Sequence, residues 1–155
     1  MIDNNYIRLN RIIALLIFIV TFIVYFDTMA PTVSYWDCGE FIAVSHTLGV
    51  PHPPGSPFFL LMGRIFSMLP FNDDIAFRVN VISPLVSALA VMLLYLSTVK
   101  VITHWRGRVN NITDVMIVFG GGAVGALTFA FTDSHWFNAV EAEVYAFSTF
   151  FTAIV

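Results

Sequence analysis

The fold class is decided by a stretch near the N-terminus, Ile12-Ile-Ala-Leu-Leu-Ile-Phe-Ile-Val-Thr-Phe-Ile-Val-Tyr-Phe26, which contains no charged residue. The apolar range of about 9–27 is long enough for a helix to cross the hydrocarbon core of a bilayer. A cleaved signal peptide is the alternative, with Arg8 and Arg11 as its basic region and residues 28–30 as its cleavage site. Further apolar runs downstream favour a helix that is retained.

The rest of the chain has the same apolar character. Of its 155 residues, 58% are apolar and 11% are charged, whereas about a quarter of the residues in a soluble domain are charged. Apolar runs at about 76–99, 115–132 and 144–155 predict three more spans, so the sequence predicts an all-α, polytopic transmembrane protein. Because the last run has no stop signal, we expect 1–155 to be the N-terminal transmembrane region of a longer protein, inactive on its own.

The connection 28–74 has no clean span, and short helices are predicted in it at about 38–49 and 58–69. Asp37 can cap the first of these helices, with Glu40 at the reciprocal position of a capping box. The second covers only about 12 apolar residues, which is short for an ordinary span. We expect it to lie along the membrane or to re-enter it.

Four local predictions concern helix ends and helix contacts. Asn72 can cap the helix that leads into the second span. Pro84 can kink that helix. Gly121 and Gly125 have the small-xxx-small spacing that lets another helix approach closely, although glycine can also be merely tolerated in a span. The segment 133–143 is expected to be a polar loop.

The basic residues predict the orientation of the spans. Two of the seven, Arg64 and Arg78, lie on one side of the predicted topology, and the other five lie on the opposite side: Arg8, Arg11, Lys100, Arg106 and Arg108. The positive-inside rule therefore places the N-terminus in the cytoplasm, with the protein in the inner (cytoplasmic) membrane. Eight of the ten acids then fall on the outer face: Asp27, Asp37, Glu40, Asp73, Asp74, Asp133, Glu141 and Glu143.

Two acidic segments on that outer face are the candidate site. The first holds Asp37 and Glu40, beside aromatic residues just after the first span; the second holds Glu141, Glu143 and Tyr145, just before the last. An acid at the membrane surface beside aromatic side chains can have a raised pKa and serve as a general base. The alternative is structural, because both segments fit capping boxes that would occupy these carboxylates.

A third group is cationic and consists of His52, Arg64 and Arg78. Together they could bind the phosphate of a lipid at the outer leaflet. Each also has a simpler interpretation: Arg64 can extend from an interfacial helix toward water, and Arg78 can pair with Asp74 one helical turn away.

Several classes of function find no support in the sequence. The single cysteine, Cys38, forms no intrachain disulfide, and no His/Cys cluster has the spacing of a zinc site. A glycine-rich phosphate loop and a basic tract for nucleic acid are also missing.

Three segments carry a resemblance to a known family: Trp36-Asp-Cys-Gly-Glu-Phe-Ile-Ala43, Leu48-Gly-Val-Pro-His-Pro-Pro-Gly-Ser-Pro57 and Val140-Glu-Ala-Glu-Val-Tyr145. They resemble the N-terminal region of a large membrane-protein family, common in bacteria and long labelled a domain of unknown function. This family includes the animal transmembrane protein O-mannosyltransferase that acts on plexin-type receptor ectodomains. The resemblance covers nearly the whole chain.

The family in turn resembles the GT-C glycosyltransferases, which carry a catalytic acid in the first external loop and use a polyprenyl-phosphate sugar. The resemblance implies transfer of a sugar, expected to be mannose, to Ser or Thr of an exported protein. Asp37 would be the catalytic acid and Glu40 a second candidate, with Glu141 and Glu143 as further acids of the site. Because a lipid phosphate is already a good leaving group, we expect no metal and no cofactor.

Two other functions remain open at this point. Broken apolar segments such as 58–69 also occur in transporters, so a transporter or flippase of a lipid-linked or anionic substrate is the main alternative. Transporters place their acids at mid-membrane, whereas here the acids gather outside. A structural membrane anchor is the third possibility, and it predicts that Asp37 can be replaced freely.

Overall fold

The computed structural model describes residues 4–107 and 109–155, and every regular element within them is helical. In chain order the elements are α1 (Asn4–Thr28), α2 (Cys38–Thr47), α3 (Pro57–Met68), α4 (Ile75–Asn80), α5 (Ile82–Arg106), α6 (Ile112–Val115), the π-helix η1 (Met116–Gly120), α7 (Gly121–Ala130), α8 (Asp133–Ala139) and α9 (Tyr145–Ile154). The expected all-α class is confirmed.

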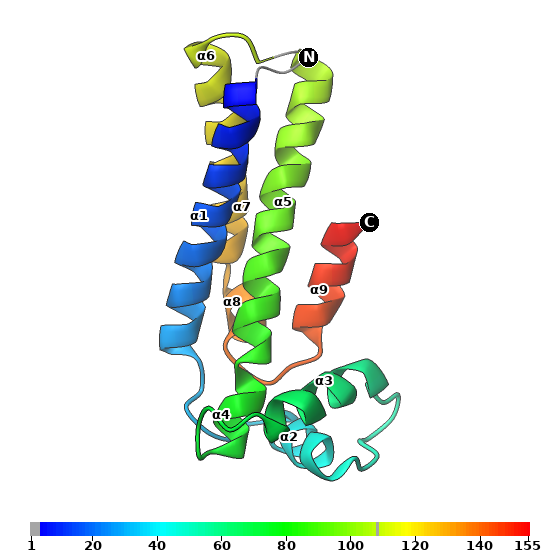
Figure 1. Cartoon of the computed structure of the whole chain (residues 1–155). Helices are drawn as coiled ribbons and strands as arrows, with labels where there is room; N and C mark the ends of the chain where they lie inside the picture. The colour runs from blue at the N-terminus through cyan, green and yellow to red at the C-terminus, as the bar shows by residue number, and fades with distance from the viewer. Residues whose placement is uncertain (1–3, 108) are drawn as a thin grey trace.

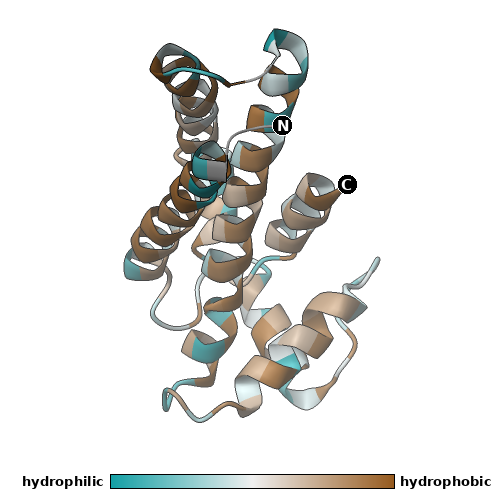
Figure 2. Cartoon of the chain, turned by 45° about the horizontal axis from the view of Figure 1, so that its top comes forward, coloured by the Kyte–Doolittle hydropathy of each residue, from teal (hydrophilic) through white to brown (hydrophobic). Residues whose placement is uncertain are grey.

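Within the described residues, three helical stretches are long and apolar enough to cross a membrane: Asn5–Thr28, Ile75–Arg106 and Ile112–Ala130. They run side by side as a bundle, with α5 in contact with α1, α7 and α9 (Figure 1). Hydrophobic residues cover these helices along most of their length, and hydrophilic residues gather toward their ends (Figure 2). This arrangement is compatible with the polytopic membrane protein that the sequence predicts.

Helices α7 and α5 approach each other closely at Gly122, which faces α5. A Cβ atom at Gly122 would lie 2.8 Å from Cγ2 of Val99 and 3.3 Å from the ring of Tyr95. The prediction of this contact at Gly121 and Gly125 is therefore wrong by one residue. A Cβ at Gly121 would come no nearer than 3.9 Å to another side chain, and one at Gly125 would have none within 4 Å.

The long helix of the second span is interrupted near its start, where Val81 separates α4 from α5. Pro84 explains the break, because a proline ring clashes with the carbonyl four residues earlier, here that of Asn80. The N-cap of α4 is Asp74, whose carboxylate accepts a hydrogen bond from Ala76 N at 2.7 Å. The predicted cap, Asn72, instead accepts a bond from Asp74 N in the turn before the helix.

Helices α2 and α3 pack against each other at one end of the bundle, and α3 lies across that end instead of along the span direction (Figure 1). Gly63 of α3 sits directly against the buried Ser45 of α2. Arg64 donates a hydrogen bond to the carbonyl of His46 near the end of α2. These contacts join α2 and α3 into a unit beside the loop that connects them.

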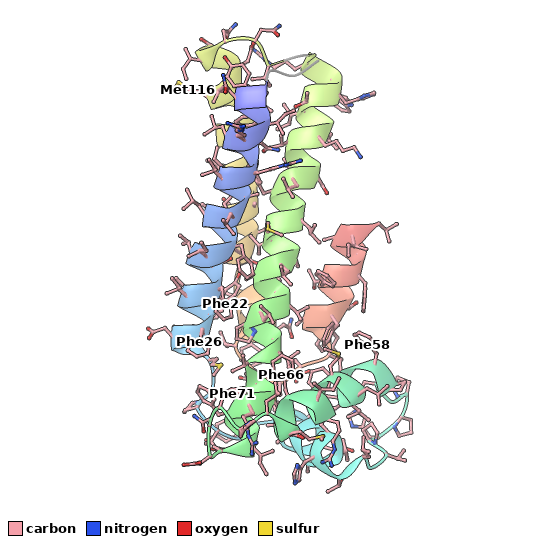
Figure 3. The ribbon with its side chains drawn as sticks, viewed as in Figure 1. Phe22, Phe26, Phe58, Phe66, Phe71 and Met116 are labelled. Atoms are coloured by element: carbon pink, nitrogen blue, oxygen red, sulfur yellow. The ribbon has the colours of Figure 1, made fainter. Side chains whose placement is uncertain are left out.

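Aromatic side chains join this unit to the last helix. Phe58 at the start of α3 lies between α3 and α9 (Figure 3). Its ring centroid is 5.0 Å from that of Phe147 and 5.3 Å from that of Phe151, both on α9. Offset and edge-to-face aromatic pairs of this kind contribute about 0.5–1.5 kcal/mol beyond their buried area, so this seam fixes α9 against α3.

The segment 133–143, expected as a polar loop, contains α8 instead. Helix α8 is retained because its aromatic side chains pack on α1: the Trp136 ring is 5.7 Å and the His135 ring 6.0 Å from the ring of Tyr25. The Tyr25 hydroxyl donates a 2.7 Å bond to the carbonyl of Ala130 at the end of α7. The polar composition of this segment gives no indication of these contacts with α1, so the sequence did not predict the helix.

Candidate active site

The two acidic segments of the sequence lie side by side in the structure because backbone hydrogen bonds tie them together. Ala30 N, just after α1, donates to the carbonyl of Val140, just before the second acidic segment, at 2.9 Å. The side chain of Asn80 donates to the carbonyls of Ala30 and Thr32 at 2.8 and 2.9 Å. Asn80 thereby holds the connection after α1 at the break between α4 and α5, and the Ala30–Val140 bond holds the second acidic segment beside it.

Asp37 and Glu40 do not form the predicted capping box. The Asp37 side chain makes no cap hydrogen bond, because its own backbone is already helical (φ −74°, ψ −12°). Both oxygens of Glu40 instead bind His52: Oε1 accepts from the backbone N–H at 2.8 Å and Oε2 lies 2.7 Å from Nδ1. Nε2 of the same ring is 3.9 Å from Oδ2 of Asp37, so one histidine faces both acids.

The second acidic segment reaches the same place from the other side. Oε2 of Glu141 accepts a 2.9 Å hydrogen bond from Ser34 and lies 3.1 Å from the Cys38 thiol, which is also 3.7 Å from Oε1 of Glu143. The backbone N of Glu143 contacts the Ser83 hydroxyl at 3.4 Å. The alternative of a capping box at Glu141 is therefore not what the structure contains.

A pocket of about 230 Å³ opens where the two segments meet. Four of the residues predicted for the site line it: Asp37, His52, Glu143 and Tyr145. The other lining residues are Phe41, Pro54, Gly55, Ser56 and Val144. Candidate residues more than 100 positions apart in the chain thus share one cavity, beside the end of the apolar bundle.

The carboxyl groups around this pocket differ in their environment. Burial raises the pKa of Glu143, and the nearby carboxylates of Asp37 and Glu141 raise it further. The pKa of Glu40 is lowered, chiefly by the hydrogen bond with the His52 ring, and the same bond raises the pKa of His52. Carboxyl groups whose pKa values are shifted in opposite directions can take different roles in proton transfer.

Arg64 and Arg78 take no part in this cluster. Arg64 donates to the carbonyl of His46, and Arg78 donates to the carbonyl of Leu69 at 3.0 Å. The structure therefore joins His52 to the acids and leaves the two arginines bound to helix-end and loop carbonyls. The charge of Arg78 does lower the pKa of Asp74, although the hydrogen bonds of that carboxyl contribute more.

Cys38 is the residue of the site that sequence reasoning missed. Its side chain is fully buried between Glu141 and Glu143, and burial raises the pKa of the thiol to about 12. It therefore stays protonated and can donate to Glu141. Its position next to Asp37 was the available signal in the sequence. Trp36, on the other side of Asp37, has a left-handed backbone (φ 62°), which is uncommon for a bulky residue.

Comparison with known proteins identifies the family. The sequence profile described as Protein O-mannosyl-transferase TMEM260 N-terminal domain matches residues 37–155. The chain belongs to this family. The match begins at Asp37 and includes both acidic segments, and it confirms the resemblance found in the sequence.

Two relatives show how much of the family's full length the chain represents. It is 32% identical over 143 residues to "Protein O-mannosyl-transferase tmem260" of Dictyostelium discoideum, and 31% identical over 121 residues to "Protein O-mannosyl-transferase TMEM260" of Mus musculus. These alignments cover 90% and 77% of this chain but 16% and 15% of the relatives. The chain thus spans about one sixth of the length of these relatives. No solved structure gives a significant match.

Proposed function

We propose that this chain is part of a membrane glycosyltransferase. The enzyme moves mannose from a polyprenyl-phosphate donor to a Ser or Thr hydroxyl of an exported protein. The observation that carries the proposal is the pocket in which Asp37 and Glu143, from two distant acidic segments, meet beside the end of the apolar bundle. The names of the two relatives support the sugar and the type of transfer. A lipid-linked donor fits a site that adjoins helices apolar enough to span a membrane.

Asp37 is the proposed general base. Its carboxylate would take the proton of the acceptor hydroxyl while that oxygen bonds to the anomeric carbon from the face opposite the phosphate. The bond between the anomeric carbon and the phosphate oxygen breaks at the same time, and the lipid phosphate leaves with the bonding electrons. Glu40 is less suited to this role because both its oxygens already bind His52. Glu143 is less suited because it is nine-tenths buried.

Asp37→Asn in the full-length protein tests this assignment. Because the Asp37 side chain makes no cap bond, and because asparagine caps a helix about as well as aspartate, the substitution should leave expression and membrane insertion intact. Removing a general base typically lowers a rate by about 10²–10⁴-fold. We expect a loss of that size in transfer of mannose from a polyprenyl-phosphate donor to a Ser/Thr peptide.

Asp73→Asn is the matched control, since Asp73 is an exposed acid of the same connection and should keep normal activity. Glu40→Gln and Glu141→Gln belong in the same series. If Asp37→Asn is active and Glu40→Gln is not, the base is the other carboxylate of α2. If all three variants transfer mannose normally, the pocket is not the catalytic site.

The orientation proposed for the membrane places the pocket on the outer face and the connection 100–114 in the cytoplasm, in accord with the positive-inside rule. Single cysteines at Ser56 and at Asn110, in a variant without Cys38, would test it. A membrane-impermeant thiol reagent added from outside should label the first and not the second. Labelling of both from outside would contradict the proposed orientation.

A further inference from the structure

Three potential metal ligands form a group at the pocket: Asp37 and His52 line it, and Glu40 binds His52. Asp37, Glu40 and His52 each offer one oxygen or nitrogen atom, and these atoms lie within 4.8 Å of one another. The side chains come from the start of α2 and from the proline-rich loop that follows it. This is a mixed oxygen and nitrogen set, which differs from a simple cluster of surface acids.

The contacts of Glu40 determine which nitrogen of His52 is available. Oε2 of Glu40 can only accept, and it lies 2.7 Å from Nδ1, so the proton of the neutral ring resides on Nδ1. Oε1 binds the backbone N–H of the same residue at 2.8 Å, which fixes the loop as well as the ring. The lone pair of Nε2 is thereby left free. A carboxylate bound to one histidine nitrogen while the other binds a metal is a recurrent arrangement in metal sites.

The free nitrogen faces an acid at a separation that suits a bridging ion. Nε2 of His52 is 3.9 Å from Oδ2 of Asp37, which is too long for a hydrogen bond. Two neighbouring ligands bound at about 2.1 Å in an octahedron lie roughly 3.0 Å apart, so a shift of about 0.9 Å would complete the contact. Glu143, nine-tenths buried, lines the same pocket from the opposite segment.

We propose that Nε2 of His52 and Oδ2 of Asp37 bind a divalent transition-metal cation such as Mn²⁺, with Glu40 as the carboxylate that orients the histidine. This proposal departs from the expectation, drawn from the lipid-phosphate leaving group alone, that the site needs no metal. An imidazole ligand favours a transition metal over Mg²⁺ or Ca²⁺, and carboxylates suit Mn²⁺. The remaining coordination positions face the pocket, where they would take water or phosphate oxygens of the donor. That last role rests on the proposed function. Oδ1 of Asp37 keeps its lone pairs for the acceptor proton, although a cation on Oδ2 lowers the basicity of the whole carboxylate.

Titration of the purified full-length protein with Mn²⁺, followed by the EPR signal of the free ion, tests the site. The protein is first stripped with a chelator and dialysed. His52→Ala should remove one Mn²⁺ per chain from the bound fraction. Glu40→Gln should weaken that site by about 10–100-fold, as other second-layer carboxylates do. His46→Ala is the matched control, because His46 has an exposed side chain, and it should bind Mn²⁺ like the wild type.

Equal free Mn²⁺ over the wild type and His52→Ala would overturn the proposal. Mannose transfer is measured on the same preparations, so that the absence of a cation site can be distinguished from failure of the proposed function. If the wild type transfers mannose and Asp37→Asn does not, while His52→Ala leaves Mn²⁺ binding unchanged, the function stands without the cation. If Mn²⁺ binding depends on His52 but no preparation transfers mannose, the cation site stands without the function. Loss of transfer with EDTA, restored by Mn²⁺ in the wild type only, would support both.

Discussion

Replacing Gly63 with alanine tests whether the packing of α3 on α2 positions the acids of the pocket. A Cβ atom at Gly63 would clash with the Ser45 hydroxyl and would lie 2.8 Å from Ser45 Cβ. The hydroxyl can rotate away, but the Cβ atom moves only with its backbone. Because two carbon atoms in contact sit about 3.5–4.0 Å apart, α2 and α3 must separate by about 1 Å.

The expected effect on stability is small and the expected effect on activity is large. Overpacking typically costs about 1–3 kcal/mol, and alanine in a helix recovers roughly 0.5–1 kcal/mol relative to glycine. The net destabilisation should therefore be no more than about 2.5 kcal/mol. The same 1 Å shift moves Asp37 and Glu40, at the start of α2, relative to Glu143 on the other side of the pocket. A misplacement of this size can lower a catalytic rate about 10²-fold.

The assay is mannose transfer by the full-length protein, with thermal unfolding in detergent measured in parallel. Ser45→Gly added to Gly63→Ala should restore transfer, because it removes both atoms of the clash and because the Ser45 hydroxyl has no hydrogen-bond partner among the described residues. Gly125→Ala is the control, since a Cβ there has no neighbour within 4 Å. Normal transfer by Gly63→Ala, or a double variant as slow as the single one, would refute the reasoning.

Two further predictions concern the bundle and the histidine. Tyr25→Phe should lower stability by about 1–3 kcal/mol in a thermal unfolding assay, because the buried carbonyl of Ala130 loses its 2.7 Å bond, whereas Tyr6→Phe, which loses an exposed 3.5 Å contact, should change little; equal effects would contradict the assignment. The Glu40–His52 pair should stabilise the protein mainly between the ordinary pKa of Glu, 4.5, and that of His, 6.5. The pKa of Glu40 is lowered in the folded protein, so the contribution of Glu40 is lost as the pH falls through this lowered pKa. The pKa of His52 is raised, so the contribution of His52 is lost as the pH rises through this raised pKa. The difference in unfolding temperature between wild type and Glu40→Gln should peak in that window, and a difference that does not vary with pH would count against the pair.

The helices were predictable from the sequence because the signal for them is local. An uncharged apolar run such as 12–26 has one stable form in a membrane, and Pro84 acts on a carbonyl only four residues away. The break between α4 and α5 follows from that rule. The acids were recognisable as candidates for a similar reason, since they gather in two short segments.

The contacts of those acids were not predictable, because each depends on a partner far along the chain. Asp37 and Glu40 have the spacing of a capping box, but Glu40 binds His52, which is 12 residues away. Glu141 also fits a box, yet it binds Ser34 and the Cys38 thiol. In both cases a long-range partner competes successfully with the local one, and spacing alone carries no information about that competition.

The prediction of which glycine contacts α5 was wrong for a related reason. The sequence has two overlapping small-xxx-small pairs between 120 and 126, namely Gly121 with Gly125 and Gly122 with Ala126. Which of these faces α5 depends on where Tyr95 and Val99 lie, and this is a property of the packed pair of helices. The same holds for α8, whose formation depends on aromatic contacts with Tyr25.

The separation of the two acidic segments has a consequence during synthesis. Cys38 and Glu141 are 103 residues apart, and ribosomes add about 5–20 residues per second. For roughly 5–20 s the first half of the pocket therefore exists without the second. During that interval the Cys38 thiol, which the finished fold buries completely, lacks the segment that covers it and is open to oxidants and to other nascent chains. Docking of the segment that holds Glu141 and Glu143 ends this interval and brings the two halves of the pocket together.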